Sequence, residues 1–397
     1  VTDVPLSETH GNYTIDLPVV RKDNGDPIES SFTLRADAAD FQTFPSGLRQ
    51  ALPLNTSEAT KEDGAWILDG APTDIVLLTL PEDARGHAHI SGSVVAGDQS
   101  AGVLVVAKGN GEAYSAVTDK AGGFTIFDVP PGDYTVRGYA AGLQLKKASV
   151  SMTADPKTGV ELATSDTELS TVSGNINIVD AAGDAATSVV LVVESTFDET
   201  FVRGEVPRGL RAPKTGDPNV TGSWSIEGVP DGEYVVLAAF ENDNLVRDPD
   251  QSIAGTDIVT VSVPDGGSRD VQLDQSFKVT EALEIVGPGA DRPEQVNAPP
   301  TLTWKDDSSE DYYHVKAYNA YGEKVYEMND IPRVTGSDTV TTPYAGRMKT
   351  GMYYQFRVTA WREAKGNGGG GMGGGNGGSQ ASPISTSEDL KGVFYVK

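Results

Sequence analysis

Hydrophobic and polar residues alternate in short runs along most of this chain, and Gly, Asn, Asp or Pro interrupts the runs every few residues. Between residues 89 and 129, for example, the runs HISGSVVA, GVLVVAKG, YSAVTD and GFTIFDV are each followed by such a break. A period of two predicts β-strands with one buried face, and the interrupting residues are those that form turns. No segment keeps helical spacing beyond a turn or two, so the pattern predicts an all-β chain of tandem Ig-like or prealbumin-like β-sandwiches with little helix.

Two stretches of the chain, 89–144 and 171–240, carry the same succession of strands and turns. Both contain Gly-x-aromatic-x-Ile followed by Val-Pro-x-Gly-x-Tyr. The matching residues are Gly122, Phe124, Ile126 and Val129–Tyr134 in one stretch, and Gly222, Trp224, Ile226 and Val229–Tyr234 in the other. Residues at alternating positions face one side of a strand, and Pro-x-Gly is a turn sequence. We therefore expect a β-hairpin at this point of each stretch.

The first residues of the chain match the middle of this unit rather than its beginning. Gly11–Ile15 fits Gly-x-aromatic-x-Ile, and SFTLRADAADFQ at 31–42 fits DYTVRGYAAGLQ at 133–144. The chain is therefore expected to begin inside a further copy, over 1–86, whose early strands are missing. Two explanations stay open: the missing strands precede residue 1 in a longer protein, or a neighbouring chain supplies them by strand addition.

The repeated motifs resemble the carboxypeptidase regulatory-like or prealbumin-like family, which is related to the B-repeats of bacterial adhesins. The resemblance rests on Ser91-Gly92 and Ser173-Gly174 near the start of two copies, followed by the two motifs above. It implies β-sandwich domains at 87–168 and at 169–281, the latter with a long loop insert. It also implies a non-catalytic module of bacterial envelope or secreted proteins. The Lys–Asn crosslink of adhesin repeats is not expected, because neither HISGSVVA nor VSGNINIV contains Lys.

The remaining region, 282–397, has a different pattern and resembles a fibronectin type III-like β-sandwich. A Pro-rich segment leads into a strand that contains Trp304, the expected core Trp between the two sheets, and Tyr353 or Tyr354 is expected at the corner of the penultimate strand. LKGVFYVK is expected to be the last strand. The segment 366–380 is almost entirely Gly and Asn, so it predicts a flexible loop.

Net charge and composition narrow the partners. The formal net charge is −26 and the isoelectric point is about 4.4, so nucleic acid is excluded as a partner. The chain contains no Cys and no apolar stretch of the length that a bilayer requires. Extracellular or cell-surface localisation is expected, and an export signal or lipid anchor would lie upstream of residue 1.

Two groups of residues are candidates for ligand binding. Acidic loop residues could bind Ca²⁺, or could simply cap solvated turns; they are Asp243, Asp248, Asp250, Asp306 and Asp307. Aromatic residues of the last domain could stack on a glycan, although alternation turns about half of them inward; the candidates are Tyr313, Tyr321 and Trp361. His87 and His89 are spaced to share a metal, but no third ligand accompanies them.

No catalytic motif is present in the sequence, and we predict that the protein is not an enzyme. The first hypothesis is an extracellular or cell-surface structural or adhesive protein that acts through protein partners or through self-assembly into a filament or array. The alternative is a carbohydrate-binding or enzyme-accessory protein of the bacterial envelope. No cofactor is expected other than Ca²⁺.

Overall fold

The computed structural model is nearly all β, as the sequence pattern predicts. The structure describes residues 11–397 except for fourteen gaps. The gaps are 18–20, 27–30, 52–53, 71–72, 180–186, 215–218, 241–245, 248–252, 254–256, 267–269, 274–276, 308, 364–380 and 389–390. The chain divides into two compact units, of which the first comprises Val1–Arg137 with Lys147–Ala163 and the second comprises Gly138–Lys146 with Thr164–Lys397.

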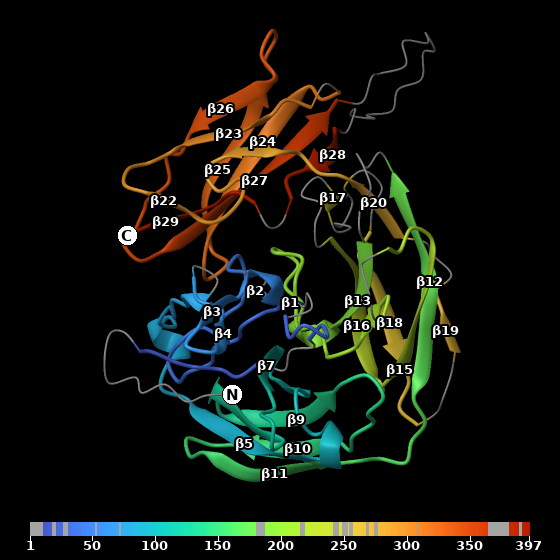
Figure 1. Ribbon diagram of the computed structural model, residues 1–397. Helices are drawn as coiled ribbons and strands as arrows, with labels where there is room; N and C mark the ends of the chain where they lie inside the picture. Colours follow the sequence, from blue (N-terminus) through green and yellow to red (C-terminus); the bar gives the residue numbers. More distant parts are fainter. Residues whose placement is uncertain are drawn as a thin grey trace. The chain divides into compact units, whose positions relative to one another are not determined.

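We number the copies in chain order, so that the second repeat is the one expected at 87–168 and the third repeat is the one expected at 169–281. The sandwich of the second repeat contains seven strands in two sheets (Figure 1). One sheet has the order β10-β9-β6-β7 and the other has the order β11-β5-β8. The strands are β5 (Ala88–Val95), β6 (Leu104–Gly109), β7 (Glu112–Val117), β8 (Gly123–Val129), β9 (Gly132–Tyr139), β10 (Ala148–Met152) and β11 (Lys157–Ala163). Ile90, Val105 and Ile126 are almost completely buried between the two sheets, so alternation has placed the apolar face inward.

The third repeat has the same order of strands. Its sheets run β14-β13-β16-β18 and β15-β12-β20-β17, with β19 also paired to β12. The strands are β12 (Ser170–Val179), β13 (Thr187–Val193), β14 (Arg211–Ala212), β15 (Ser223–Val229), β16 (Gly232–Phe240), β17 (Val246–Arg247), β18 (Val259–Val263), β19 (Asp270–Gln272) and β20 (Phe277–Glu281). The counterpart of β7 is the two-residue β14, and the chain between β13 and β14 is the long insert.

The prediction of a β-hairpin at Val-Pro-x-Gly-x-Tyr in each repeat is wrong. β8 and β9 belong to different sheets, and so do β15 and β16, which means that Val-Pro-x-Gly carries the chain across the sandwich instead of reversing it within one sheet. The backbone changes direction at Asp128 and at Gly228, both of which have positive φ (52° and 71°). Burial on both sides of the bend explains the crossing, since Val129 and Val229 are fully buried and are followed by strands whose own partners lie in the opposite sheet.

The N-terminal region has short strands and two-stranded sheets. β1 (Ser31–Phe32) pairs with β2 (Leu54–Asn55), and β3 (Thr60–Glu62) pairs with β4 (Ala65–Ile67). Residues 11–17 lie outside any strand, so the strand expected at Gly11–Ile15 is not formed. The short 3₁₀ helices of the described chain are η1 (Thr56–Glu58), η3 (Glu82–Ala84), η4 (Gly97–Gln99) and, in the third repeat, η5 (Glu194–Thr196).

One element of the repeat is nevertheless reproduced near the N-terminus. In the turn at 38–42 the Phe41 amide donates to the Ala38 carbonyl at 3.2 Å, and Asp40 has a φ of 67°. In the aligned turn at 140–144 the Leu143 amide donates to the Ala140 carbonyl, also at 3.2 Å, and the residue aligned with Asp40 is Gly142, with a φ of 77°. The alignment of AADFQ with AAGLQ therefore corresponds to a shared backbone conformation.

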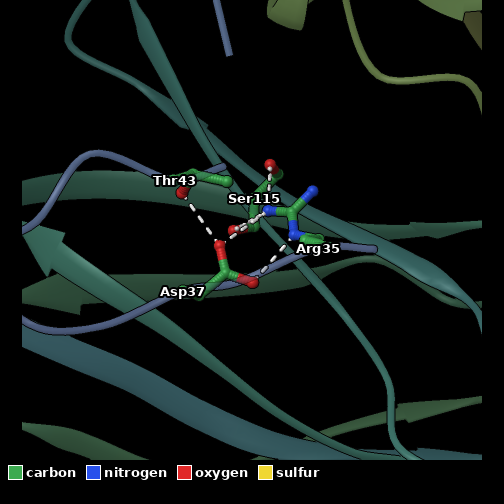
Figure 2. A network of polar contacts seen from close by, with 4 residues as sticks. All are labelled: Arg35, Asp37, Thr43 and Ser115. Carbon is green, nitrogen blue, oxygen red and sulfur yellow. Dashed lines mark hydrogen bonds and ion pairs between the residues drawn. The ribbon is translucent and has the colours of Figure 1, made fainter. Parts of the chain in front are cut away.

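A polar network joins the N-terminal region to the edge strand β7 of the second repeat (Figure 2). The Arg35 guanidinium donates to both carboxylate oxygens of Asp37, at 2.8 and 3.1 Å, and to the carbonyl and hydroxyl of Ser115, at 3.1 and 3.2 Å. The Thr43 hydroxyl donates to Asp37 at 2.8 Å. Arg35 thus covers part of a free strand edge, which is the part of a sheet most open to unwanted pairing.

The C-terminal sandwich packs a three-stranded sheet, β21-β23-β26, against a larger sheet, β22-β29-β27-β24-β25, with β28 also paired to β27 (Figure 1). Trp304 is fully buried and contacts Tyr313 edge-on, with ring centroids 5.4 Å apart. The amide of Lys349 donates to the Tyr354 hydroxyl at 2.7 Å, at the start of the long strand β27. The strands are β21 (Ile285–Gly287), β22 (Glu294–Val296), β23 (Thr301–Lys305), β24 (Tyr312–Asn319), β25 (Lys324–Pro332), β26 (Thr339–Pro343), β27 (Tyr353–Arg362), β28 (Ser382–Thr386) and β29 (Val393–Val396).

Candidate functional site

The acidic residues proposed for Ca²⁺ fall into two groups. Asp243, Asp248 and Asp250 lie outside the described residues, as does the Gly-rich segment 366–380. Asp306 and Asp307 are described, and both already accept hydrogen bonds from the protein. Within the described part of the chain, no group of three or more acidic, His or Cys side chains is arranged to hold a metal ion.

The contacts of Asp306 and Asp307 belong to a structural turn. Asp306 accepts a hydrogen bond from the Tyr313 hydroxyl at 2.9 Å, and the Asp307 amide donates to that same hydroxyl at 2.7 Å. Asp307 also accepts from the amide and the hydroxyl of Ser309, at 3.0 and 2.8 Å. Glu310 is 1% exposed, and burial raises the pKa of its carboxyl. Asp306 and Asp307 thus order the loop between β23 and β24.

Tyr313 packs in the core instead of on an accessible surface, because its ring is fully buried against Trp304. Burial raises the pKa of its hydroxyl far above the ordinary value for tyrosine. Tyr321 follows β24 in a turn, where its amide donates to Asn319 at 3.0 Å. Of the three aromatic residues predicted from the sequence to bind glycan, Trp361 is the one that the structure places in an aromatic cluster on the outer side of its sheet.

We call Tyr312, His314 and Trp361 the aromatic cluster. Tyr312 pairs directly with Trp361 across β24 and β27, and their ring planes are parallel within 4°, with centroids 6.4 Å apart. His314 contacts both rings, with centroids 5.3 Å from Tyr312 and 4.8 Å from Trp361. All three side chains are half-buried and lie on the face opposite to Tyr313 and Val315.

Polar groups flank the aromatic cluster. The His314 Nε2 atom lies 3.5 Å from the carboxylate of Asp330, whose side chain is 82% exposed. Burial raises the pKa of the Tyr312 hydroxyl, and the carboxylates of Asp330, Glu363 and Asp311 act in the same direction. The cluster is therefore a pair of parallel rings beside negative charge, an arrangement that can stack on a neutral or hydroxyl-rich ring.

The sequence reasoning considered Tyr312 among the aromatic residues of this domain but selected neither Tyr312 nor His314 as a candidate site residue. The available signal was strand parity: Tyr312 and His314 are two residues apart, so they share a face that Tyr313 cannot reach. Choosing between the two parities required the burial of Val315 and Ala317, both fully enclosed. The pattern Tyr-x-Val-x-Ala, if treated as the inward set, would have placed Tyr313 in the core and Tyr312 outside.

The motif residues, and Asp119 just before the first motif of the second repeat, have structural contacts. The Asp119 carboxylate accepts from the amides of Ala121 and Gly123, at 2.8 and 2.9 Å, and so caps the turn before β8. The Tyr134 hydroxyl donates to the Pro130 carbonyl at 3.0 Å, and the Tyr234 hydroxyl donates to the Pro230 carbonyl at 2.8 Å. The conserved spacing between repeats is thereby explained by the fold.

The two histidines near β5 do not share a contact in the structure. His87 lies within 3.3 Å of the Asp83 carbonyl through Nε2. The ring of His89 lies beside Phe127, with centroids 6.4 Å apart.

Comparison with known proteins supports part of the resemblance. Residues 89–165 match the model of the carboxypeptidase regulatory-like domain. No curated protein matches the chain. None of the helices in the described part of the chain has the length and hydrophobicity needed to cross a membrane.

Several solved structures are distantly similar. They include the TIE protein of Bacillus anthracis (11% identity, 79% of this chain and 50% of that chain, TM-score 0.18). The minor pilin GBS52 of Streptococcus agalactiae gives 13% identity, 49% and 96% coverage and a TM-score of 0.19, and a streptococcal ancillary pilin gives 12%, 78% and 97%, and 0.17. This chain spans half the length of the TIE protein, and likenesses at these TM-scores carry no argument about function.

Proposed function

We propose that this chain is a non-enzymatic protein of the cell surface or the extracellular space, in which tandem β-sandwiches space, adhere or assemble. The observation that carries the proposal is that the residues repeated along the chain are used to build the fold. Tyr134 and Tyr234 occupy the same motif position, and each donates a hydrogen bond to the carbonyl of the motif proline at the crossing between sheets. A module whose repeated residues are structural is suited to extending a protein by repetition.

The assembly that we propose is strand addition at the N-terminal region by a second copy of the chain. The sheets described there have two strands each, and strands this short and few are marginally stable alone. All three residues of β3 are exposed, and Ile67 of β4 is 39% exposed. An added strand would cover these groups and could pair with the backbone at the edge of the described β3–β4 sheet.

Light scattering and negative-stain electron microscopy of the purified chain test this proposal. Fibres, arrays or oligomers that grow with concentration are expected, and Ile67→Lys should reduce them. Val286→Lys is the matched control, because Val286 is 42% exposed on the C-terminal sandwich, so it should leave assembly unchanged. A chain that stays monomeric at every concentration tested would contradict assembly by strand addition.

The second candidate function is glycan binding at the aromatic cluster. The observation that favours it is the parallel arrangement of the Tyr312 and Trp361 rings, with the polar side chains of His314 and Asp330 beside them. Sugar rings combine an apolar face with hydroxyl groups, so they suit an aromatic surface flanked by polar side chains.

Sedimentation of the chain with insoluble cellulose, chitin and peptidoglycan tests the glycan proposal. At least one polymer should retain the native chain, and Trp361→Ala and Tyr312→Ala should each reduce the retained fraction at least tenfold. Tyr395→Ala is the control, since it removes a different cross-strand pair, Tyr353 and Tyr395, whose ring centroids are 4.9 Å apart. Equal retention of all variants, or of none including the native chain, would contradict the proposal.

A further inference from the structure

The insert of the third repeat contains a closed loop that we call the clamp loop, residues Asp198–Arg203. The amide of Asp198 donates to the Arg203 carbonyl at 2.7 Å, and the amide of Arg203 donates back to the Asp198 carbonyl at 3.2 Å. The Asp198 carboxylate also accepts from the Thr200 amide at 2.8 Å. These bonds give the tip of the loop a defined conformation.

The base of the clamp loop is anchored to the third sandwich. The Val193 amide donates to the Glu205 carbonyl at 3.0 Å, and the Thr196 hydroxyl accepts from the Glu205 amide at 2.9 Å. Gly204 permits the close approach, since a Cβ atom there would lie 2.5 Å from a methyl group of Val192.

Val202 packs against one face of the sheet that contains β13 and β16. It is 1% exposed and belongs to a cluster with Val190, Val192, Val235 and Leu237. Its φ is 51°, a conformation that β-branched residues rarely adopt. Strain at a buried residue persists only where the surrounding contacts enforce it, so the direction of the chain at this residue is determined by packing.

The residues that precede Val202 contact the C-terminal sandwich. Phe201 is 2% exposed and packs edge-on against Tyr318 of β24, with ring centroids 6.1 Å apart. The carbonyl of Thr200 accepts a hydrogen bond from the Arg357 guanidinium of β27. Burial lowers the pKa of Arg357, while Tyr318, Glu388 and Asp198 act in the opposite direction. Phe201 and Val202, which are adjacent in sequence, therefore contact two different sandwiches.

We propose that the clamp loop is an interaction element that binds the outer face of the C-terminal sandwich. It thereby couples the sandwich of the third repeat and the C-terminal sandwich into one rigid body. The occupied part of that face is Tyr318 and Arg357, in the same two strands as the aromatic cluster. The inference holds whatever the surface function of the protein, because it concerns the junction alone. The two sandwiches are also connected through the chain near residue 282, and domains in one chain move relative to each other unless the interface between them is large and hydrophobic.

Distances between spin labels on the two sandwiches test the proposal. The chain has no Cys, so Ser225→Cys and Thr350→Cys, at two exposed positions of β15 and of the turn before β27, give two unique labelling sites. The native clamp should give one narrow distance distribution. The double variant Phe201→Ala with Arg357→Met should at least double its width, because it removes the ring contact and the hydrogen bond together.

The control keeps both the fold and the contact of the clamp loop with Tyr318 and Arg357. Tyr395→Ala removes an aromatic residue from the same sheet, and its distribution should stay as narrow as that of the native chain. Near-ultraviolet circular dichroism, to which the buried pair Trp304 and Tyr313 contributes, monitors whether each variant keeps its folded side-chain packing. A double variant that is folded and has a native width, or a native chain that is already broad, would overturn the proposal.

Discussion

The second and third repeats share one order of strands. They differ mainly at the edge strand that follows β6 or β13, which is β7 in the second repeat and β14 in the third. In the second repeat, β6 and β7 form a hairpin closed by Asn110-Gly111, with φ of 53° and 82°, the turn geometry that suits a right-twisted strand pair. In the third repeat, β13 is followed by the clamp loop and the two-residue β14. The repeat tolerates this exchange because the replaced strand lies at the edge of its sheet.

The two edges are completed in different ways. The free edge of β7 receives Arg35 from the preceding region, whereas the insert next to β14 contacts the sandwich that follows. The same edge position therefore contacts the preceding region of the chain in the second repeat and the following sandwich in the third repeat. A repeat fold acquires new contacts at its edges while its central strands are unchanged.

The largest predicted effect separates the central strands of the two repeats. An added Cβ at Gly92 would lie 1.8 Å from the Val160 carbonyl oxygen, a backbone atom of the adjacent strand. At the aligned Gly174 it would lie 2.8 Å from the edge of the Trp224 ring, which can shift. We expect Gly92→Ala to lower the free energy of unfolding of its sandwich by about 3 kcal/mol, and Gly174→Ala by about 1 kcal/mol.

Differential scanning calorimetry measures both changes, and the transition that each variant lowers identifies the sandwich to which it belongs. Two variants with equal effects would contradict the difference in packing between the repeats.

The next effect concerns the crossing between sheets. Tyr234 is fully buried, and its hydroxyl donates to the Pro230 carbonyl at 2.8 Å; Tyr134 is 3% exposed, and its bond to the Pro130 carbonyl is 3.0 Å. Removing the hydroxyl leaves a buried carbonyl without that donor, so Tyr234→Phe should cost about 2 kcal/mol and Tyr134→Phe about 1 kcal/mol. Each Phe keeps the ring contact with Tyr139 or Tyr114.

Chemical denaturation followed by near-ultraviolet circular dichroism checks this order. If neither variant changes the midpoint, the crossing is not stabilised by the tyrosine hydroxyls.

The sequence predicted the strands of the repeats but not how they pair. Phe124 and Ile126 alternate as expected, yet a hairpin and a crossing bury the same positions of an isolated strand. Asp128 aligns with Gly228, and both residue types tolerate the positive φ that the structure shows at this position. This pair of residues does not indicate whether the chain then turns back within its sheet or crosses to the opposite sheet.

The candidate site was predicted less well than the fold. Trp304 was predicted in the core because a buried Trp suits an inter-sheet position, and it is fully enclosed. Tyr313 was assigned to the surface because adjacent tyrosines give no parity by themselves. The contacts of Phe201 could not be predicted, since they join residues more than a hundred positions apart and depend on a loop without a repeating pattern.

The smallest predicted effect concerns the two residues at the bend, Asp128 and Gly228. Asp128 is 7% exposed and accepts a hydrogen bond from the Asp40 amide at 2.7 Å. Burial raises the pKa of its carboxyl and the charge of Asp40 adds to this, while the hydrogen bond from Asp40 and the charge of His87 oppose it. The native state therefore binds the proton more tightly than the unfolded state does, so stability falls as pH rises through the native pKa.

Asp128→Asn removes this charge and keeps an acceptor for the Asp40 amide. We expect the variant to be more stable than the native chain by about 0.5–1 kcal/mol at pH 7, and the difference to disappear as pH falls below the ordinary pKa of aspartate. The readout is the calorimetric transition that Gly92→Ala lowers, followed from pH 3 to pH 8. Asp98→Asn removes the same charge from an exposed position of the same sandwich and should not change with pH in this way. A stabilisation of Asp128→Asn that is equal at pH 3 and pH 7 would mean that side-chain packing or backbone strain, and not the buried charge, distinguishes this bend from the one that contains Gly228.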